Sequence, residues 1–313
     1  MVKNEAARVA AIDVGTNSVR LVLGHMEHGI FIREHKYVCT TRIGEGTSST
    51  DVLLEEPMRR TAAAVGEFAA QAKREGYALL GAYATSAVRE APNRDTFAAL
   101  CAQAGVSLDI LSGHAESAIG FYGAAQGKPG TCIVADIGGG STELCVGTAG
   151  RLAFGDSARV GAVRMRERFA DAQGCLDDAS RAKLFQYAQD MLRPIARQLG
   201  PYDTLIGVGG TFTTLCAMQQ QLTVYDPQRV EGATLQAAQI AQFAKTLCQM
   251  PLSKRLQLPG LSPRRADIIA AAAVIAEAVM SVTGASNLQV SERDGLEGYA
   301  QAVYQNELAA LCT

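Results

Sequence analysis

The sequence predicts an α/β protein that consists of two related domains. Its length of 313 residues corresponds to about two domains of ordinary size. Apolar residues make up 48% of the chain and charged residues 19%, so a sizeable core can form and disorder is not expected. Apolar runs typical of β-strands alternate with segments of helical periodicity, which is the order of elements in α/β proteins.

A duplicated segment indicates that the two domains are related. Residues 13–24 (DVGTNSVRLVLG) align without gaps on residues 136–147 (DIGGGSTELCVG), with five identical positions in twelve. Both copies contain small polar residues between apolar runs, so each predicts a strand, a tight turn and a second strand. We therefore place the first domain at residues 1–125 and the second at residues 126–313. A terminal helix at residues 297–313 can pack back on the first domain.

The other elements follow from periodicity and from turn residues. In the first half, apolar residues at helical spacing predict helices at residues 51–74, 94–104 and 114–125. Runs of β-type residues predict strands at residues 30–40, 77–84 and 106–111. The Gly- and Pro-containing stretch at residues 126–130 predicts the domain boundary. In the second half, the same criteria predict strands at 204–208 and 287–291 and helices at 177–199, 211–221, 235–250, 263–282 and 296–311.

The composition argues against several functional classes. A formal net charge of -2 lacks the basic excess of nucleic-acid-binding proteins, and an aromatic share of 6% without Trp disfavours base-stacking surfaces. Asp267 and Glu277 interrupt the Ala-rich apolar stretch, so we expect no membrane span. Eight cysteines without CxxC spacing and only four histidines argue against a zinc centre. Such unclustered thiols are typical of a reducing cytoplasm, where we expect the protein.

The tips of the two hairpins have the composition of phosphate-binding turns. Glycine lets the backbone approach a ligand closely, and successive backbone N–H groups with neighbouring hydroxyls form a concave anion site. Two ordinary hairpin turns are the alternative, but the duplication, with an Asp before each turn, favours phosphate. The predicted phosphate ligands are Gly15, Thr16, Asn17 and Ser18 in the first copy and Gly138, Gly139, Gly140, Ser141 and Thr142 in the second.

Four further motifs accompany the two turns: ATSAVR at 84–89, LSGHAE at 111–116, GAVRMRERF at 161–169 and GVGGT at 207–211. Together with AIDVGTNSVR and DIGGGSTE they resemble, in order, the exopolyphosphatase and guanosine-pentaphosphate phosphohydrolase (Ppx/GppA) family in its short two-domain form. The resemblance implies two actin-like (RNase H-like, ASKHA) α/β domains with an interdomain cleft.

The resemblance also implies roles for single residues. Glu116 corresponds to the family's essential glutamate and would act as the general base on water, whereas spacing alone favours a helix-capping acid. Arg89 would contact phosphate, and is otherwise an ordinary surface arginine. Gly209, Gly210 and Thr211 would contact phosphate at a helix N-terminus, or else permit a close strand–helix crossing.

The matched positions Arg20 and Glu143 differ in charge between the two copies. One basic and one acidic turn suit a site where Arg20 binds phosphate and the acidic side binds Mg²⁺. We predict Asp136 and Glu143 as ligands of Mg²⁺ or another divalent cation, with Asp13 acting through water, and we count Glu143 with Glu116 as catalytic. Turn-capping roles are the alternative for the two aspartates.

The expected reaction releases orthophosphate from a phosphoric anhydride. Polyphosphate is the first expected substrate, because basic windows at residues 151–168 and 252–265 suit an extended polyanion. The alternatives are pppGpp, whose guanine would stack on Phe121, Tyr122 or Phe212, and a phosphate-binding regulator without turnover. The sequence departs from the family pattern at Leu296, where the family often has an arginine, and the consequence of this difference stays open. Whether the protein forms a homodimer stays open as well.

Overall fold

The computed structural model describes residues 7–47, 50–148 and 150–311, which fold into two compact units. Unit 1 contains Met1–Gly123 together with Asp294–Thr313, and unit 2 contains Ala124–Arg293. The first boundary lies close to the predicted one. The second unit, however, ends at Arg293 and not at residue 313, because the final segment belongs to unit 1. Residues 1–6 and 312–313, at the outer ends of the predicted domains, lie outside the described residues.

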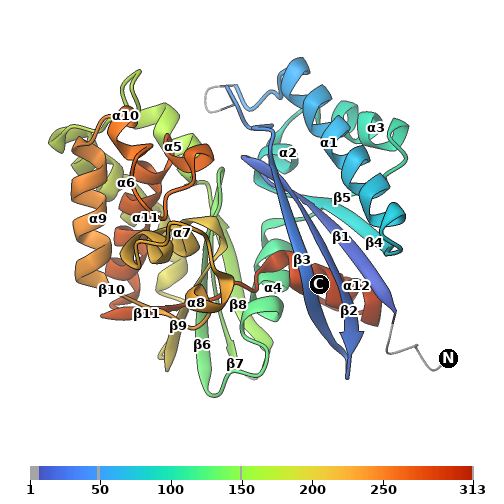
Figure 1. Cartoon of the computed structure of the whole chain (residues 1–313). Coiled ribbons are helices and arrows are strands. Elements are labelled where there is room, and N and C mark those ends of the chain that lie inside the picture. Colours follow the sequence, from blue (N-terminus) through green and yellow to red (C-terminus); the bar gives the residue numbers. More distant parts are fainter. Residues whose placement is uncertain (1–6, 48–49, 149, 312–313) are drawn as a thin grey trace. The chain divides into compact units, whose positions relative to one another are not determined.

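Unit 1 is built on a sheet with the strand order β3-β2-β1-β4-β5 (Figure 1). Strands β1 to β3 form an antiparallel meander, and β4 and β5 run parallel to β1. The strands are β1 (Arg8–Val14), β2 (Ser18–Glu27), β3 (Ile30–Thr40), β4 (Ala78–Ala84) and β5 (Leu108–Ile110). The helices are α1 (Glu55–Arg74), α2 (Ser86–Glu90), α3 (Arg94–Gln103), α4 (Gly113–Ala124), α12 (Gly295–Gln305) and α13 (Leu308–Leu311).

Alternation along β1 divides the core of unit 1 between the two faces of its sheet. Ala10 and Ile12 pack in one cluster with residues of α1 and α3, whereas Val9 and Ala11 pack in another with residues of α4 and α12. Because successive side chains of a strand point to opposite faces, Asp13 shares the face of α4 and α12. The sheet therefore presents the carboxylate of Asp13 towards the C-terminal segment of the chain.

Helices α4 and α12 pack closely through glycine. A Cβ on Gly298 would lie 1.9 Å from the carbonyl oxygen of Ile119, and one on Gly123 would lie 2.1 Å from that of Asp294. No other residue fits this contact without a shift of the backbone. Beside it, Leu296 and Tyr299 are fully buried in the cluster on the α4 face. Leu296 is thus a core residue here.

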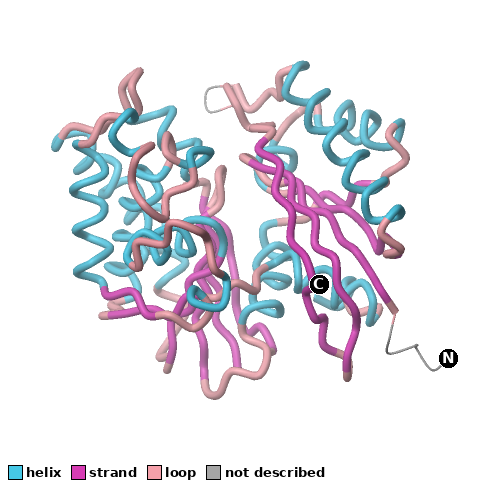
Figure 2. Tube along the Cα trace, in the orientation of Figure 1, coloured by secondary structure: helices cyan, strands magenta, loops and turns pink. Residues whose placement is uncertain are grey.

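Unit 2 repeats the topology of unit 1. Its sheet has the order β10-β11-β9-β6-β7-β8, so that β8-β7-β6-β9-β11 corresponds to β3-β2-β1-β4-β5 with β10 added. The duplication predicted from the two turns is therefore confirmed. Figure 2 shows the strands of each unit gathered in one sheet with helices beside it. The strands are β6 (Thr131–Ile137), β7 (Thr142–Thr148), β8 (Arg151–Ala158), β9 (Thr204–Val208), β10 (Thr234–Gln236) and β11 (Asn287–Val290).

The core of unit 2 lies between one face of this sheet and its helices. Residues Ile133, Ala135 and Ile137 of β6 pack with the almost completely buried α11 and with α6 and α9. Asp136, on the alternate face of β6, is excluded from this cluster. The helices are α5 (Ala162–Phe169), α6 (Asp178–Ala196), α7 (Gly209–Gln219), α8 (Pro227–Val230), α9 (Ala237–Gln249), α10 (Leu252–Arg255), a 3₁₀ turn (Pro263–Arg265) and α11 (Ile269–Thr283).

Several elements end where the backbone conformation changes rather than where periodicity predicts. Helix α1 begins at Glu55 and not at residue 51, because Asp51 has a φ of 55°. The predicted terminal helix is divided into α12 and α13 at Asn306, which has a φ of 59°. Residues 234–236 form strand β10 instead of starting a helix. Among the described residues, no helix is long and apolar enough to span a membrane.

Candidate functional site

The predicted residues of unit 1 gather at one edge of its sheet. The Thr85 N–H donates to the Val14 carbonyl (3.3 Å), and the Leu111 N–H donates to the Ala84 carbonyl (3.0 Å), so β1, β4 and β5 end together. The carboxyl edge of parallel strands is where α/β proteins place their ligands. The segments that leave this edge carry Gly15, Thr16, Asn17, Ser18, Arg89 and Glu116.

Unit 2 gathers its predicted residues at the equivalent edge. Strands β6, β9 and β11 are parallel neighbours, with Asp136 opposite Val208 and Val290 opposite Gly207. The segments that follow them are the turn at residues 138–141, the first turn of α7 and the pair Ser291–Glu292. Ser291 and Glu292 were not predicted, since nothing in their local sequence marks them.

The two glycine turns have the same hydrogen-bonded geometry. The Gly15 N–H donates to the Ser18 carbonyl, and the Gly138 N–H donates to the Ser141 carbonyl, both at 3.0 Å. Each turn is braced through its own carbonyls, by the Gly44 N–H in unit 1 and by the N-terminal N–H groups of α5 in unit 2. The duplicated sequence thus specifies a duplicated conformation.

Two of the predicted hydroxyl ligands bond to backbone. Thr142 Oγ1 donates to the Val160 carbonyl, and Thr211 Oγ1 donates to the Ile137 carbonyl at 3.0 Å. Both side chains are buried. The Thr142 hydroxyl therefore fastens the second turn to the loop between β8 and α5, and the Thr211 hydroxyl fastens the start of α7 to β6.

Glu116 lies in the first turn of α4, paired with a cation. Arg89 Nη1 donates to Glu116 Oε2 at 2.6 Å and to the Leu111 carbonyl at 3.2 Å. Arg89 stands on the short helix α2, which follows β4. Burial raises the pKa of the Glu116 carboxyl, and the charge of Asp13 raises that pKa further, whereas Arg89 lowers it. A carboxylate with a raised pKa suits proton transfer near neutral pH.

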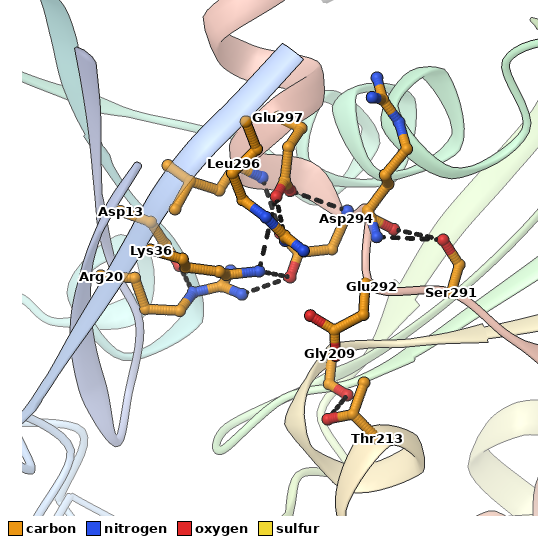
Figure 3. A network of polar contacts seen from close by, with 12 residues as sticks. Asp13, Arg20, Lys36, Gly209, Thr213, Ser291, Glu292, Asp294, Leu296 and Glu297 are labelled. Carbon is orange, nitrogen blue, oxygen red and sulfur yellow. Dashed lines mark hydrogen bonds and ion pairs between the residues drawn. The ribbon is translucent and has the colours of Figure 1, made fainter. Parts of the chain in front are cut away.

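Arg20 is held between two buried carboxylates. Its Nε and Nη2 lie 2.6 and 2.5 Å from Asp13 Oδ2, and its Nη1 lies 2.5 Å from Asp294 Oδ2. Lys36 Nζ lies 3.0 Å from the same Asp294 oxygen, as Figure 3 shows. The Arg20 guanidinium is thus paired with two carboxylates of unit 1, and its contact with phosphate stays a prediction.

Asp294 joins the network to the start of α12. Its Oδ1 accepts a hydrogen bond from the Leu296 N–H, and Glu297 completes a capping box by accepting from the Asp294 N–H. Burial alone would raise the pKa of Asp294, but Arg20 and Lys36 hold that pKa below its usual range. Arg33 pairs with Glu297 at 2.6 Å, so strands β2 and β3 are tied to α12 by charge.

Asp136 and Glu143 form the acidic counterpart in unit 2. They are directly opposite each other on β6 and β7, so both side chains leave the same face of the sheet. Glu143 is buried, and Ser157 Oγ on β8 donates to Glu143 Oε1 at 2.5 Å. A Cβ on Gly209 would lie 2.4 Å from Asp136 Oδ1, and Gly209 has a φ of 75°. Gly209 therefore leaves the space that the Asp136 carboxylate occupies.

The carboxylates of Asp136 and Glu143 fit a divalent cation better than the equivalent residues of the first copy do. Two adjacent carboxylates are the ligands that Mg²⁺ takes from a protein, with water completing its shell. In the first copy the equivalent pair is Asp13 and Arg20, which neutralise each other. Within the described ranges, no three His, Cys, Asp or Glu side chains form a metal-binding group. Asp13 is the buried partner of Arg20, and its water-mediated role toward a cation stays a prediction.

The comparison with known proteins decides the family. The Ppx/GppA phosphatase family matches residues 21–300. The chain belongs to this family. Exopolyphosphatase 2 of Mycobacterium tuberculosis is 32% identical over 315 residues, which cover 94% of this chain and 97% of that protein.

Solved structures of Ppx/GppA proteins share the fold. The crystal structure of the Aquifex aeolicus family member is 27% identical and has a TM-score of 0.80, covering 96% of this chain and 98% of its own. That of an exopolyphosphatase-like protein is 26% identical with a TM-score of 0.89, covering 95% and 98%. The predicted fold of two related α/β domains is therefore confirmed as one shared with Ppx/GppA proteins, and this Ppx/GppA phosphatase is a hydrolase.

Proposed function

We propose that this Ppx/GppA phosphatase is an exopolyphosphatase, which releases orthophosphate from the end of inorganic polyphosphate. The observation that carries the proposal is the half-buried Glu116–Arg89 pair at the carboxyl edge of unit 1, beside the first glycine turn. Relatives named Exopolyphosphatase 1 and 2 support the same substrate.

In the proposed reaction a water oxygen attacks the terminal phosphorus in line with the bridging oxygen. The new P–O bond forms as the bond to the bridging oxygen breaks, and Glu116 accepts the proton of the water. The remaining chain leaves as the anion. The backbone N–H groups of the glycine turns are proposed to bind the phosphate oxygens, so that catalysis depends on positioning and on charge neutralisation.

Asp136 and Glu143 are the residues that would hold a divalent cation. When bound, Mg²⁺ would neutralise charge on the phosphate. Gly209 keeps space for the Asp136 carboxylate, and Ser157 fixes one oxygen of Glu143. These contacts support the donor set independently of the resemblance to the family.

The side chains favour polyphosphate over pppGpp. Two aromatic residues considered for guanine stacking, Phe121 and Phe212, are completely buried. The third, Tyr122, donates its hydroxyl to Gln305 Oε1 at 2.5 Å. Of the second basic window, however, Arg255 is also fully buried and donates to the Gly174 carbonyl, so this arginine serves the fold and not a surface for polyanions.

The decisive test compares phosphate release from polyphosphate and from pppGpp at one ionic strength with Mg²⁺. We expect higher kcat/KM on polyphosphate and loss of activity after chelation, restored by added Mg²⁺. Glu143→Gln is expected to lower the affinity for Mg²⁺ while Glu167→Gln, in the same unit, does not. A higher kcat/KM on pppGpp would overturn the substrate, and release from neither would favour a regulator.

A second prediction concerns pH. Arg89 lowers the pKa of Glu116, so Arg89→Met should raise that pKa and leave a smaller fraction of Glu116 ionised at any given acidic pH. We expect the acid limb of the kcat profile to move to higher pH, whereas Arg94→Met, at an exposed arginine of α3, leaves it in place. An unchanged acid limb in Arg89→Met would separate Glu116 from the proton transfer.

A further inference from the structure

Three polar residues stand in one row across the adjacent strands β6, β7 and β8 of unit 2. Asp136 on β6 is opposite Glu143 on β7, and Glu143 is opposite Ser157 on β8. Because directly opposed residues of antiparallel strands share a face, all three side chains leave the same side of the sheet. The row ends in a hydroxyl whose donor is directed at Glu143 Oε1, 2.5 Å away.

This hydrogen bond restrains the Glu143 side chain. A glutamate has three rotatable side-chain bonds, and ordering it in one rotamer costs conformational free energy. Glu143 is 3% exposed, and the charge-assisted bond from Ser157 fixes one of its two carboxylate oxygens before any ligand arrives. The serine therefore acts on the geometry of the acid pair without being part of that pair.

The first hairpin offers an internal comparison. In its equivalent row, Asp13 is opposite Arg20 and Arg20 is opposite Val38. Where the second position is an arginine, held by Asp13 and Asp294, the third position is apolar and exposed. Where the second position is a glutamate, the third is a hydroxyl that bonds to it. A hydroxyl thus stands at the third position only in the hairpin whose second position is a carboxylate.

We propose that Ser157 is a positioning residue, which orients Glu143 for a divalent cation. The proposal rests on the proposed function, because it takes Asp136 and Glu143 as the ligands. Loss of a hydrogen-bonded partner behind a metal ligand typically weakens metal affinity by about 10–100-fold. We expect a loss of that size in Ser157→Ala.

The test measures Mn²⁺ binding by electron paramagnetic resonance, with Mn²⁺ as the probe for the acid pair. Ser157→Ala should weaken Mn²⁺ binding by about tenfold or more, and Ser157→Thr, which keeps the hydroxyl, should restore most of it. Ser281→Ala, which removes a hydroxyl bonded to Gln189 on other helices, is the matched control and should bind like the wild type. Circular dichroism melting checks that each variant is folded.

Activity supplies a second readout. If Ser157 only positions Glu143, saturating Mg²⁺ should return kcat of Ser157→Ala close to the wild-type value, with the defect confined to the Mg²⁺ concentration at half-activation. Unchanged Mn²⁺ affinity in Ser157→Ala would overturn the inference and leave the hydrolase proposal standing. If Ser157→Ala weakens Mn²⁺ binding while the wild type releases no phosphate from polyphosphate, the inference is supported and the proposed function is overturned. If Glu143→Gln does not weaken Mn²⁺ binding, Glu143 is not a ligand of the cation, and the inference is overturned.

Discussion

Glu116→Gln is expected to lower kcat for phosphate release by about two orders of magnitude or more, the scale of losing a positioned general base. Glutamine keeps the size of the side chain and can still accept a hydrogen bond from Arg89, so the fold should be retained. What is lost is the group that takes the proton from water. The measurement is kcat with polyphosphate at saturating Mg²⁺, in the wild type and the variant.

The matched control for this variant is Glu90→Gln. Glu90 lies on α2, on the same side of unit 1, and accepts a hydrogen bond from Ser86 Oγ that glutamine can also accept. The Glu90→Gln substitution removes one negative charge near Arg89 and should change kcat only slightly. A Glu116→Gln enzyme with kcat near the wild-type value would show that another group accepts the proton.

Asp294→Ala is expected to give the largest loss of stability, about 3–5 kcal/mol, as is usual when one partner of a buried ion pair is removed. Both Arg20 and Lys36 would lose their contact with Asp294 Oδ2, and the Leu296 N–H would lose its cap. The measurement is urea-induced unfolding followed by circular dichroism. If the two units unfold separately, the transition of unit 1 should move and that of unit 2 should not.

An exposed ion pair provides the control for Asp294→Ala. Glu55 and Arg59 lie one turn apart on α1, 2.8 Å from each other, and both side chains are more than half exposed. Glu55→Ala should therefore cost no more than about 0.5 kcal/mol. A comparably small loss in Asp294→Ala would mean that the network around Arg20 contributes little to holding α12 on the sheet.

The sequence predicts most of what is local in this site. Identity between the two turns was enough to place the duplicated hairpins, and the charges of Asp136 and Glu143 could be assigned to one face once both strands were recognised. The helix that carries Arg89, α2, was not predicted because its five residues are too few to show helical periodicity. Ser157 could have been found by extending the hairpin alignment by one strand, but a single serine within a basic window gives no signal of its own.

Contacts distant in the chain could not be predicted in this way. Arg20 has the composition of a phosphate ligand when its turn is considered alone. Its second partner, Asp294, is separated from it by 274 positions, and no periodicity joins the two. Only the return of α12 to the first sheet turns this arginine into an internal counter-ion. The same return explains Leu296, whose place in a buried cluster has no local signature.

The return of α12 to unit 1 also sets the order in which the chain can be completed during translation. Domains usually fold as they leave the ribosome, with the N-terminal one first. Here the α4 face of the first sheet must wait for Leu296 and Tyr299, which are synthesised only after the whole of residues 124–293. The unit that begins the chain is thus the last to close its core, and its nascent form exposes an apolar surface throughout synthesis of the other unit.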